Sequence, residues 1–295
     1  MKLRAMRISE SRPGRRAASP GAPAAPASRR APPLSPAREI AALNGDPNFM
    51  TSLARGLAVI RAFTEQRRKP TIAQISERTG IPRAAVRRCL YTLEKLGYVE
   101  AEGYAFALRP KMLTLGHAYL SSTPLAVSAQ SFLDRVGDAV NESCSLAILD
   151  GDEILYLARS VTSRIMSVTL NIGSRLPAYC TSVGYVLLAH LPEPDLDAYL
   201  ARVEFRSFTE RTITSPEKLR EVLKAVRQAG YAIADQEMEL GIRSIAVPVS
   251  DTSGRTVAGI NVIVQAARVR VRQMKTQYLP HLEGAARELG TLLLP

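Results

Sequence analysis

The stretch 71–108, TIAQISERTGIPRAAVRRCLYTLEKLGYVEAEGYAFAL, decides the fold of the first part of the chain. Thr71 can cap a helix that ends at Gly80, and a tight turn leads from Gly80 directly into a second helix, which Gly97 ends. Two short segments of alternating apolar and polar residues follow. Helix, turn, helix and hairpin is the order of a winged helix-turn-helix. The sequence therefore predicts this module over residues 48–110.

Apolar residues at helical spacing indicate the core of this module. A further helix, capped by Ser52, is predicted ahead of the quoted stretch. Its inward-facing residues are expected to be Leu53, Leu57, Ile60 and Phe63. Pro82 is expected at the first position of the last helix, where its missing amide hydrogen is not needed. The apolar or small residues of that helix form one stripe: Ala85, Val86, Cys89, Leu90, Leu93 and Leu96.

The side of the last helix opposite this stripe is basic. Arg83, Arg87 and Arg88 follow the start of the helix, where an arginine can bind a guanine edge or hold phosphates. We expect Arg55 and Thr71, each at a helix start, to contact phosphates. The alternative is a basic, solvated helix in a small bundle. The predicted DNA-binding residues are Arg55, Thr71, Arg83, Ala84, Arg87 and Arg88.

The charge of the chain is unevenly distributed. The formal net charge of +12 divides into +6 for residues 1–50, +7 for residues 51–120 and −1 for residues 121–295. Duplex DNA attracts such a basic region through counterion release, although a solvated basic face without a partner would show the same charge. Residues 1–47 are a basic segment rich in proline and alanine, which predicts a disordered tail.

Several classes of function are disfavoured by composition. No apolar run is long enough to span a membrane. The 3 cysteines and 3 histidines are scattered, so neither a disulfide framework nor a metal site is expected, and few cysteines fit a reducing, cytoplasmic location. No cofactor motif and no catalytic constellation is present. An enzyme with an accessory DNA-binding head and an architectural DNA protein stay as alternatives to a regulator.

The second part of the chain has mixed secondary structure. A connecting helix is predicted over residues 111–121, followed by a domain over residues 122–295. Strand-like runs are Ser145–Leu149, Ile154–Ser160, Met166–Leu170, Ser244–Val249 and Val257–Val264. Helical runs are Thr181–Leu191, Pro216–Ala229 and Val271–Leu294. This order predicts an α+β fold with an antiparallel or mixed sheet covered by helices.

Several blocks resemble one family of regulators. SLARGLAVI at 52–60, GSRLPAYCTSVG at 173–184, GYAIADQE at 230–237 and GIRSIAVP at 241–248 look like the IclR type, and the resemblance covers about residue 45 to the end. The lead-in GDPNFM and the PAYCTS block look most like the PcaR/PcaU/PobR branch, which regulates aromatic-acid and β-ketoadipate catabolism.

The resemblance implies a winged helix-turn-helix, a linker helix and a GAF-like effector domain in a homodimer or tetramer. Such a protein would bind promoter DNA and respond to a small carboxylate of the protocatechuate, 4-hydroxybenzoate or β-ketoadipate type. It would activate an aromatic catabolic operon, with RNA polymerase as a further partner. A repressor that responds to an unrelated metabolite is the alternative within the family.

The resemblance also implies an effector site. Carried over by position, its residues are Thr181, Ser182, Val183, Gly184, Ala234, Ser244, Asn261 and Ile263. This chain departs from relatives in having no carboxylate near Ala234 and in having Tyr185 where a lysine is common. Both departures concern which ligand is bound.

The residues themselves favour an anion site. The start of a helix at Thr181 and Ser182 would offer free amide hydrogens to an anion. Ser182, Ser244 and Asn261 are neutral donors, although Ser182 could be a helix cap and Ser244 a bonded strand hydroxyl. Asn261 lies among apolar residues and needs a partner if it is buried.

Three charged residues close to this site invite a catalytic interpretation. Asp235 and Glu237 could form an acid–base pair, and Arg243 could clamp an anion. We favour a structural network of salt bridges and hydrogen bonds that stiffens the rim of the pocket.

Overall fold

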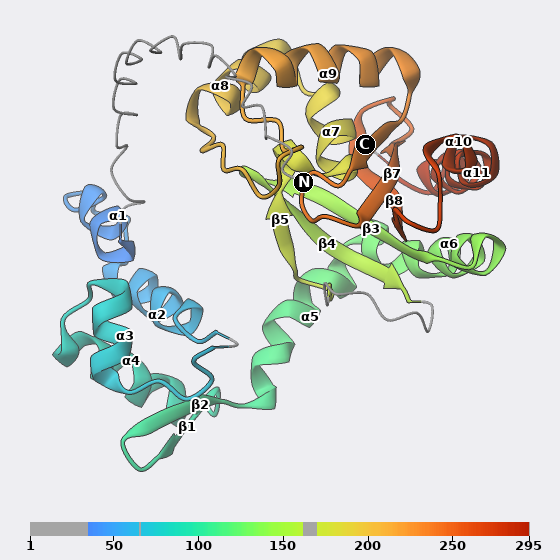
Figure 1. The fold of residues 1–295 in the computed structure, drawn as a ribbon. Helices are drawn as coiled ribbons and strands as arrows, with labels where there is room; N and C mark the ends of the chain where they lie inside the picture. Colours follow the sequence, from blue (N-terminus) through green and yellow to red (C-terminus); the bar gives the residue numbers. More distant parts are fainter. Residues whose placement is uncertain (1–34, 65, 162–169, 295) are drawn as a thin grey trace, which may run out of the picture. The chain divides into compact units, whose positions relative to one another are not determined.

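The computed structural model describes residues 35–64, 66–161 and 170–294 (Figure 1). The chain divides into two units, Met1–Pro110 and Lys111–Pro295. Among the described residues, no helix has the length and apolar character that a membrane crossing needs.

The first unit is a helical module with a hairpin. Its elements are α1 (Pro36–Ala42), α2 (Thr51–Arg61), α3 (Ile72–Thr79), α4 (Arg83–Lys95), β1 (Val99–Glu102) and β2 (Ala105–Leu108). Thr71 and Gln74 form a capping box at the start of α3, and Gly80 ends that helix with a φ of 71°, which favours glycine. The strands β1 and β2 pair in antiparallel register. The helix-turn-helix and its hairpin thus have the order predicted.

The buried face of α2 differs from the predicted one. Leu53 and Leu57 are 58% and 52% exposed, whereas Ala58, Val59 and Ala62 are buried against α4 and its neighbours. Helix α2 has apolar residues on more than one side, so its sequence is compatible with burial of either of two faces. Small side chains occupy the face that packs closely, and the larger leucines stay outside.

Three boundaries in this unit also differ. Helix α2 begins at Thr51 with Met50 as its N-cap, so Ser52 lies within the helix. Pro82 has an extended ψ of 139° and is the N-cap of α4, not its first residue. Helix α1 lies inside the segment predicted to be disordered, because Pro36 starts it and its residues Ala37 and Ile40 pack on the core of the unit.

The second unit is built on one antiparallel sheet. Its strands are β3 (Ser143–Asp150), β4 (Glu153–Ser160), β5 (Arg175–Pro177), β6 (Ala232–Asp235), β7 (Ile242–Ser250) and β8 (Thr256–Gln265), in the spatial order β5-β4-β3-β8-β7-β6. The predicted α+β class is confirmed. Four of the predicted strand-like runs lie within β3, β4, β7 and β8, whereas positions 166–169 of the remaining run lie outside the described residues.

Helices cover both faces of this sheet (Figure 1). The helical elements that follow β2 in the chain are η1 (Pro110–Met112), α5 (Leu113–Ser122), α6 (Pro124–Val140), η2 (Ala178–Cys180), α7 (Ser182–Ala189), α8 (Glu193–Arg202), α9 (Pro216–Ala229), α10 (Val271–Gln273), η3 (Met274–Tyr278) and α11 (Leu279–Gly290). Helices α6 and α11 pack on one face, and α7 packs on the other, with α9 against it. The predicted helix Val271–Leu294 is interrupted by the π-helical η3, just before Pro280.

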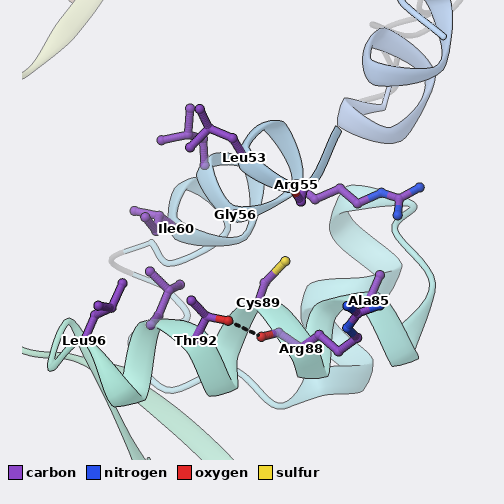
Figure 2. A pocket seen from close by; sticks show the side chains of 12 residues that line it. Leu53, Arg55, Gly56, Ile60, Ala85, Arg88, Cys89, Thr92 and Leu96 are labelled. Atoms are coloured by element: carbon purple, nitrogen blue, oxygen red, sulfur yellow. Dashed lines mark hydrogen bonds between the residues drawn. The ribbon is translucent and has the colours of Figure 1, made fainter. Parts of the chain in front are cut away.

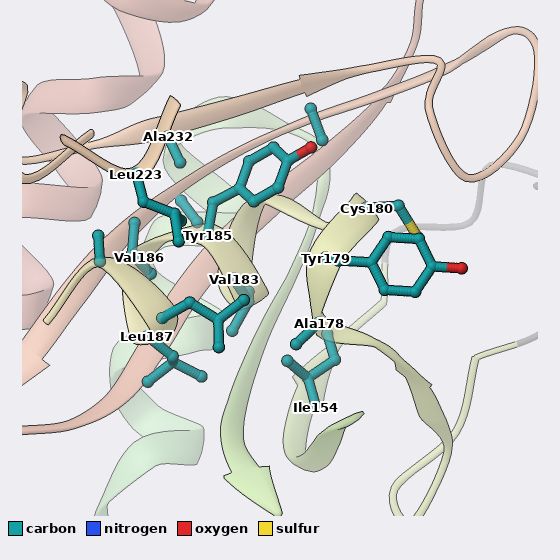
Figure 3. Close-up of a cluster of buried hydrophobic side chains, with 14 of the residues drawn as sticks. Ile154, Ala178, Tyr179, Cys180, Val183, Tyr185, Val186, Leu187, Leu223 and Ala232 are labelled. Atoms are coloured by element: carbon teal, nitrogen blue, oxygen red, sulfur yellow. The ribbon is translucent and has the colours of Figure 1, made fainter. Parts of the chain in front are cut away.

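Helix α7 is buried along its whole length. Figure 3 shows Val183, Val186 and Leu187 of α7 in one apolar cluster with Leu223 of α9. A Cβ atom on Gly184 would lie 2.0 Å from the carbonyl oxygen of Ala178. Only glycine therefore permits α7 to start this close to the preceding segment.

A β-bulge changes the side-chain pattern of β4. The register with β3 shifts between Leu146 and Ala147, which pair with Ala158 and Tyr156, so that β4 has one extra residue. Tyr156 and Arg159 are an odd number of positions apart and would point to opposite faces of a regular strand. The bulge brings both side chains to the same face, which is the face that α7 covers.

Candidate nucleic-acid interface and effector cavity

The exposed face of α4 has the chemistry of a nucleic-acid contact. Arg83, Arg87 and Arg88 are exposed, as is Ala84 between them. Among the described residues, no carboxylate forms an ion pair with any of these three arginines. Their guanidinium groups are therefore available to phosphates or base edges.

The opposite side of α4 fixes this face in place. Val86 and Leu90 are fully buried in the core of the unit. The turn ahead of α4 is held by two hydrogen bonds, from Ser76 Oγ to the carbonyl oxygen of Ile81 at 2.7 Å and from the Ile81 amide to Thr79 Oγ1 at 3.2 Å. A rigid turn presents the start of the helix in one orientation.

The two predicted phosphate contacts have different surroundings. Thr71 is the N-cap of α3, and its Oγ1 accepts a hydrogen bond from the Gln74 amide at 3.3 Å. Arg55 lies one turn inside α2, not at its start as predicted, and is half-buried. Thr71 thus stays at a helix start, whereas Arg55 belongs to the surface between α2 and α4.

That surface is an apolar groove. Figure 2 shows Leu53 and Ile60 of α2 facing Cys89 of α4 and Leu96, the C-cap of that helix, with Arg55 and Arg88 at one end. Leu96 is 52% exposed although it belongs to the stripe predicted to be core. Apolar spacing predicts that both sides of this groove are interior, because spacing alone does not distinguish a core from an exposed groove.

A cavity of about 160 Å³ lies on the α7 side of the sheet in the second unit. Its lining residues are Tyr156, Leu170, Leu176, Cys180, Thr181, Ala234, Glu237, Met238, Glu239, Ile242, Ser244, Asn261 and Ile263. Most of the wall is apolar, with a few polar groups. A cavity with this volume and a mostly apolar wall suits a small organic molecule.

The structure brings five of the eight predicted effector residues into this wall: Thr181, Ala234, Ser244, Asn261 and Ile263. The other three, Ser182, Val183 and Gly184, are packed in the protein and do not line the cavity. Thr181 caps α7 by accepting a hydrogen bond from the Gly184 amide at 3.1 Å. One of the free amide groups at the start of α7 is thus bonded to the helix's own cap. Fewer amide hydrogens are left for an anion than predicted.

The remaining lining residues were missed from the sequence. Tyr156 comes from β4, Cys180 from η2, and Glu237 and Met238 from the segment after β6. Their positions in the chain are far apart, so no spacing links them. Only Glu237 stood out, and it was assigned to a structural network.

That network is only partly as predicted. Asp235 is ion-paired with Arg243 at 2.7 Å and with Arg211 at 3.4 Å. Burial raises the pKa of Asp235, but the hydrogen bonds from Arg243 and Gln236 and the positive charges of Arg243 and Arg211 together keep that pKa below its ordinary value. Glu237 instead accepts a hydrogen bond from Tyr185 and faces the cavity.

The ionisable groups of the wall favour neutral forms. Burial raises the pKa of Glu237. Burial likewise raises the pKa of Cys180 and of Tyr156 to about 12. The Asn261 side chain opposes this rise in Tyr156 through a hydrogen bond. The cavity is therefore a poorly hydrated site with weak acids in its wall.

Comparison with known proteins agrees with both units. A family model described as the IclR helix-turn-helix domain matches residues 52–103, and one described as the bacterial transcriptional regulator IclR C-terminal matches residues 117–291. The chain is a member of the IclR family of bacterial transcriptional regulators. It is thus a DNA-binding regulator with a C-terminal effector domain, and not an enzyme.

Individual relatives cover nearly the whole chain. The Pca regulon regulatory protein of Pseudomonas putida is 55% identical, over 90% of this chain and 93% of its own length. The p-hydroxybenzoate hydroxylase transcriptional activator of Acinetobacter baylyi is 37% identical, over 83% and 93%. An IclR homologue from Microbacterium hydrocarbonoxydans, crystallised with 4-hydroxybenzoate, is 26% identical with a TM-score of 0.71, over 82% of this chain and 98% of its own.

Proposed function

We propose that this regulator senses a hydroxylated aromatic acid in the 160 Å³ cavity and activates genes for the breakdown of such acids. The cavity is the observation that carries the proposal. An apolar cavity of about 150 Å³ holds one benzene ring. The relatives support the choice of ligand, since one is an activator for p-hydroxybenzoate hydroxylase and another was crystallised with 4-hydroxybenzoate.

The DNA-binding half of the proposal places α4 in the major groove. Its start, with Arg83, Arg87 and Arg88, would contact base edges and phosphates, while Thr71 and Arg55 would contact phosphates beside it. Ala84 is small and exposed, which would allow α4 to approach the groove floor.

We infer that the working form is a homodimer or tetramer. Leu53, Leu57 and Leu96 expose a large apolar surface along the groove between α2 and α4, as monomers rarely do. A second copy that covers this surface would present a second α4 to the next half-site of a palindrome.

Effector binding would change the balance between two arrangements of this oligomer. Helix α5, which opens the second unit, would be the coupling element, since none of its residues is buried. An activator of this kind would act on the promoter in the cytoplasm, where RNA polymerase is its further partner.

A ligand screen tests the proposal. The full chain is heated with protocatechuate, 4-hydroxybenzoate or β-ketoadipate, and with glyoxylate as a control acid without a ring. A bound ligand raises the melting temperature in proportion to its occupancy. We expect a shift with the hydroxylated aromatic acids and little with glyoxylate. Shifts with glyoxylate alone would contradict the proposed ligand class.

A further inference from the structure

Three polar side chains form a row across the sheet beside the cavity. Ser145 of β3 is paired in register with Arg159 of β4 on one side and with Asn261 of β8 on the other. Directly opposed residues of neighbouring strands point to the same face, and neighbouring strands lie about 4.8 Å apart. Because Asn261 lines the cavity, the whole row faces the cavity side of the sheet.

Each member of the row has a buried polar atom without a hydrogen-bond partner in the part of the chain that the structure describes. These atoms are Ser145 Oγ, Arg159 Nε and Asn261 Oδ1. Ser145 and Asn261 are 0% and 2% exposed, so water does not readily replace a partner. Native proteins seldom leave such groups unpaired, and three adjacent ones indicate a site that a ligand completes.

Arg159 is the cation of this row. One of its terminal nitrogens donates to the carbonyl oxygen of Leu170, a lining residue, at 2.8 Å. Burial lowers the pKa of Arg159. Among the described residues, no carboxylate is ion-paired with this guanidinium. A half-buried, uncompensated positive charge next to a cavity favours an anion.

The opposite part of the wall disfavours an anion. Glu237 and Glu239 line the cavity beyond β6. The strand order separates β6 from β4 by β7, β8 and β3. Neither carboxyl group offers a positive charge to an anion, so a ligand carboxylate is favoured at the end of the cavity beside Arg159.

We propose, building on the proposed function, that the effector lies along this row in one direction, with its carboxylate on Arg159 and Ser145 and its ring hydroxyl donating to Asn261 Oδ1. Arg159 Nε and the Ser145 hydroxyl supply hydrogen atoms to the carboxylate. The Asn261 side chain is hydrogen-bonded to Tyr156, and its Oδ1 has no partner among the described residues, so this oxygen is available to accept from the ring hydroxyl. Arg159 and Ser145 become specificity-determining residues for the acid group.

Paired ligands test the position of the carboxylate. The full chain is titrated calorimetrically with 4-hydroxybenzoate and with the neutral 4-hydroxybenzamide. Arg159→Gln should weaken binding of the acid about 10- to 100-fold, since hydrogen bonds to charged groups are the strong ones. Binding of the amide should change less than about threefold. Arg135→Gln, an exposed arginine of α6 on the other side of the sheet, is the matched control and should change neither.

A second pair of ligands tests the hydroxyl. Asn261→Val should abolish the preference for 4-hydroxybenzoate over benzoate and leave benzoate binding nearly unchanged. Arg159→Lys keeps the charge and should recover part of the preference for the acid, which a purely structural role of Arg159 would not produce. Equal losses for acid and amide in Arg159→Gln would overturn this inference and leave the proposed function standing. A wild-type chain that binds none of these aromatic ligands would overturn both.

Discussion

The Tyr185 hydroxyl donates a hydrogen bond to the Glu237 carboxylate at the wall of the cavity. Tyr185 is 1% exposed and comes from α7, whereas Glu237 follows β6, so this bond joins the helix to the edge of the sheet. A lysine at position 185, which the family resemblance would lead one to expect, would neutralise Glu237. A tyrosine leaves the carboxylate hydrogen-bonded without an opposite charge from that position.

This pair predicts a pH dependence of stability. Burial raises the pKa of Glu237 in the folded chain, so the proton is held more tightly there than in the unfolded chain. The stability from this group is fully present below its unfolded pKa, roughly pH 4, and is lost as the pH rises through the higher folded pKa. Glu237→Gln removes the titration. The unfolding free energy of this variant relative to wild type should increase between pH 4 and pH 8, as followed by urea denaturation.

The matched variant Tyr185→Phe removes the donor and keeps the carboxyl group. It should destabilise the chain by about 1–2 kcal/mol, because a half-buried carboxylate then lacks its partner. The loss should be larger at pH 8 than at pH 4. An identical loss of stability at both pH values would mean that the protonation state of Glu237 does not affect this hydrogen bond.

The arginines of α4 predict a change in DNA affinity that depends on salt. Replacement of Arg83, Arg87 and Arg88 by Ala should lower operator affinity by more than about 100-fold, because each phosphate or base contact is lost. The slope of log affinity against log salt should become shallower by up to about three. Fluorescence anisotropy over a salt series measures both quantities.

The control for the α4 variants is Arg206→Ala, an exposed arginine of the second unit. Its operator affinity should match that of wild type. Unaltered binding after loss of the three α4 arginines would refute the assignment of the recognition helix.

Two glycines in helices predict opposite effects of the same substitution. Gly184→Ala places a methyl group 2.0 Å from the Ala178 carbonyl oxygen, so the second unit should lose about 3 kcal/mol or more. Gly116→Ala in α5 has no heavy atom within 4 Å and should be neutral or stabilise by up to about 1 kcal/mol. Melting curves of both variants make the comparison. A stable Gly184→Ala chain would show that α7 and its preceding segment can separate without cost.

Much of the fold could be predicted because its signals are local. Thr71, Gly80 and Gly97 mark helix ends through capping and backbone conformation, and α9 has the bounds Pro216–Ala229 that its periodicity indicates. The face of α2 could not be predicted in the same way. Its outward leucines are as apolar as core residues, and only tertiary packing determines that Val59 is buried and Leu57 is exposed.

The cavity was harder to predict for two physical reasons. Arg159 could not be placed beside Tyr156, because strand alternation puts them on opposite faces and only the bulge in β4 reverses this. Ser182 and Gly184 were expected in the wall because the family resemblance places them there. In the structure Thr181 caps α7, and the close contact with Ala178 fills the space that a ligand would need.

The cavity beneath α7 is the proposed binding site of the aromatic acid. Ala234 is 6% exposed and lies in the cavity wall, so Ala234→Phe fills the space that one ring occupies. Calorimetric titration with 4-hydroxybenzoate should show binding to wild type and at least a 100-fold weaker affinity for the variant, with operator affinity unchanged. Equal affinity of both chains for 4-hydroxybenzoate would contradict the account, because the acid would then bind elsewhere.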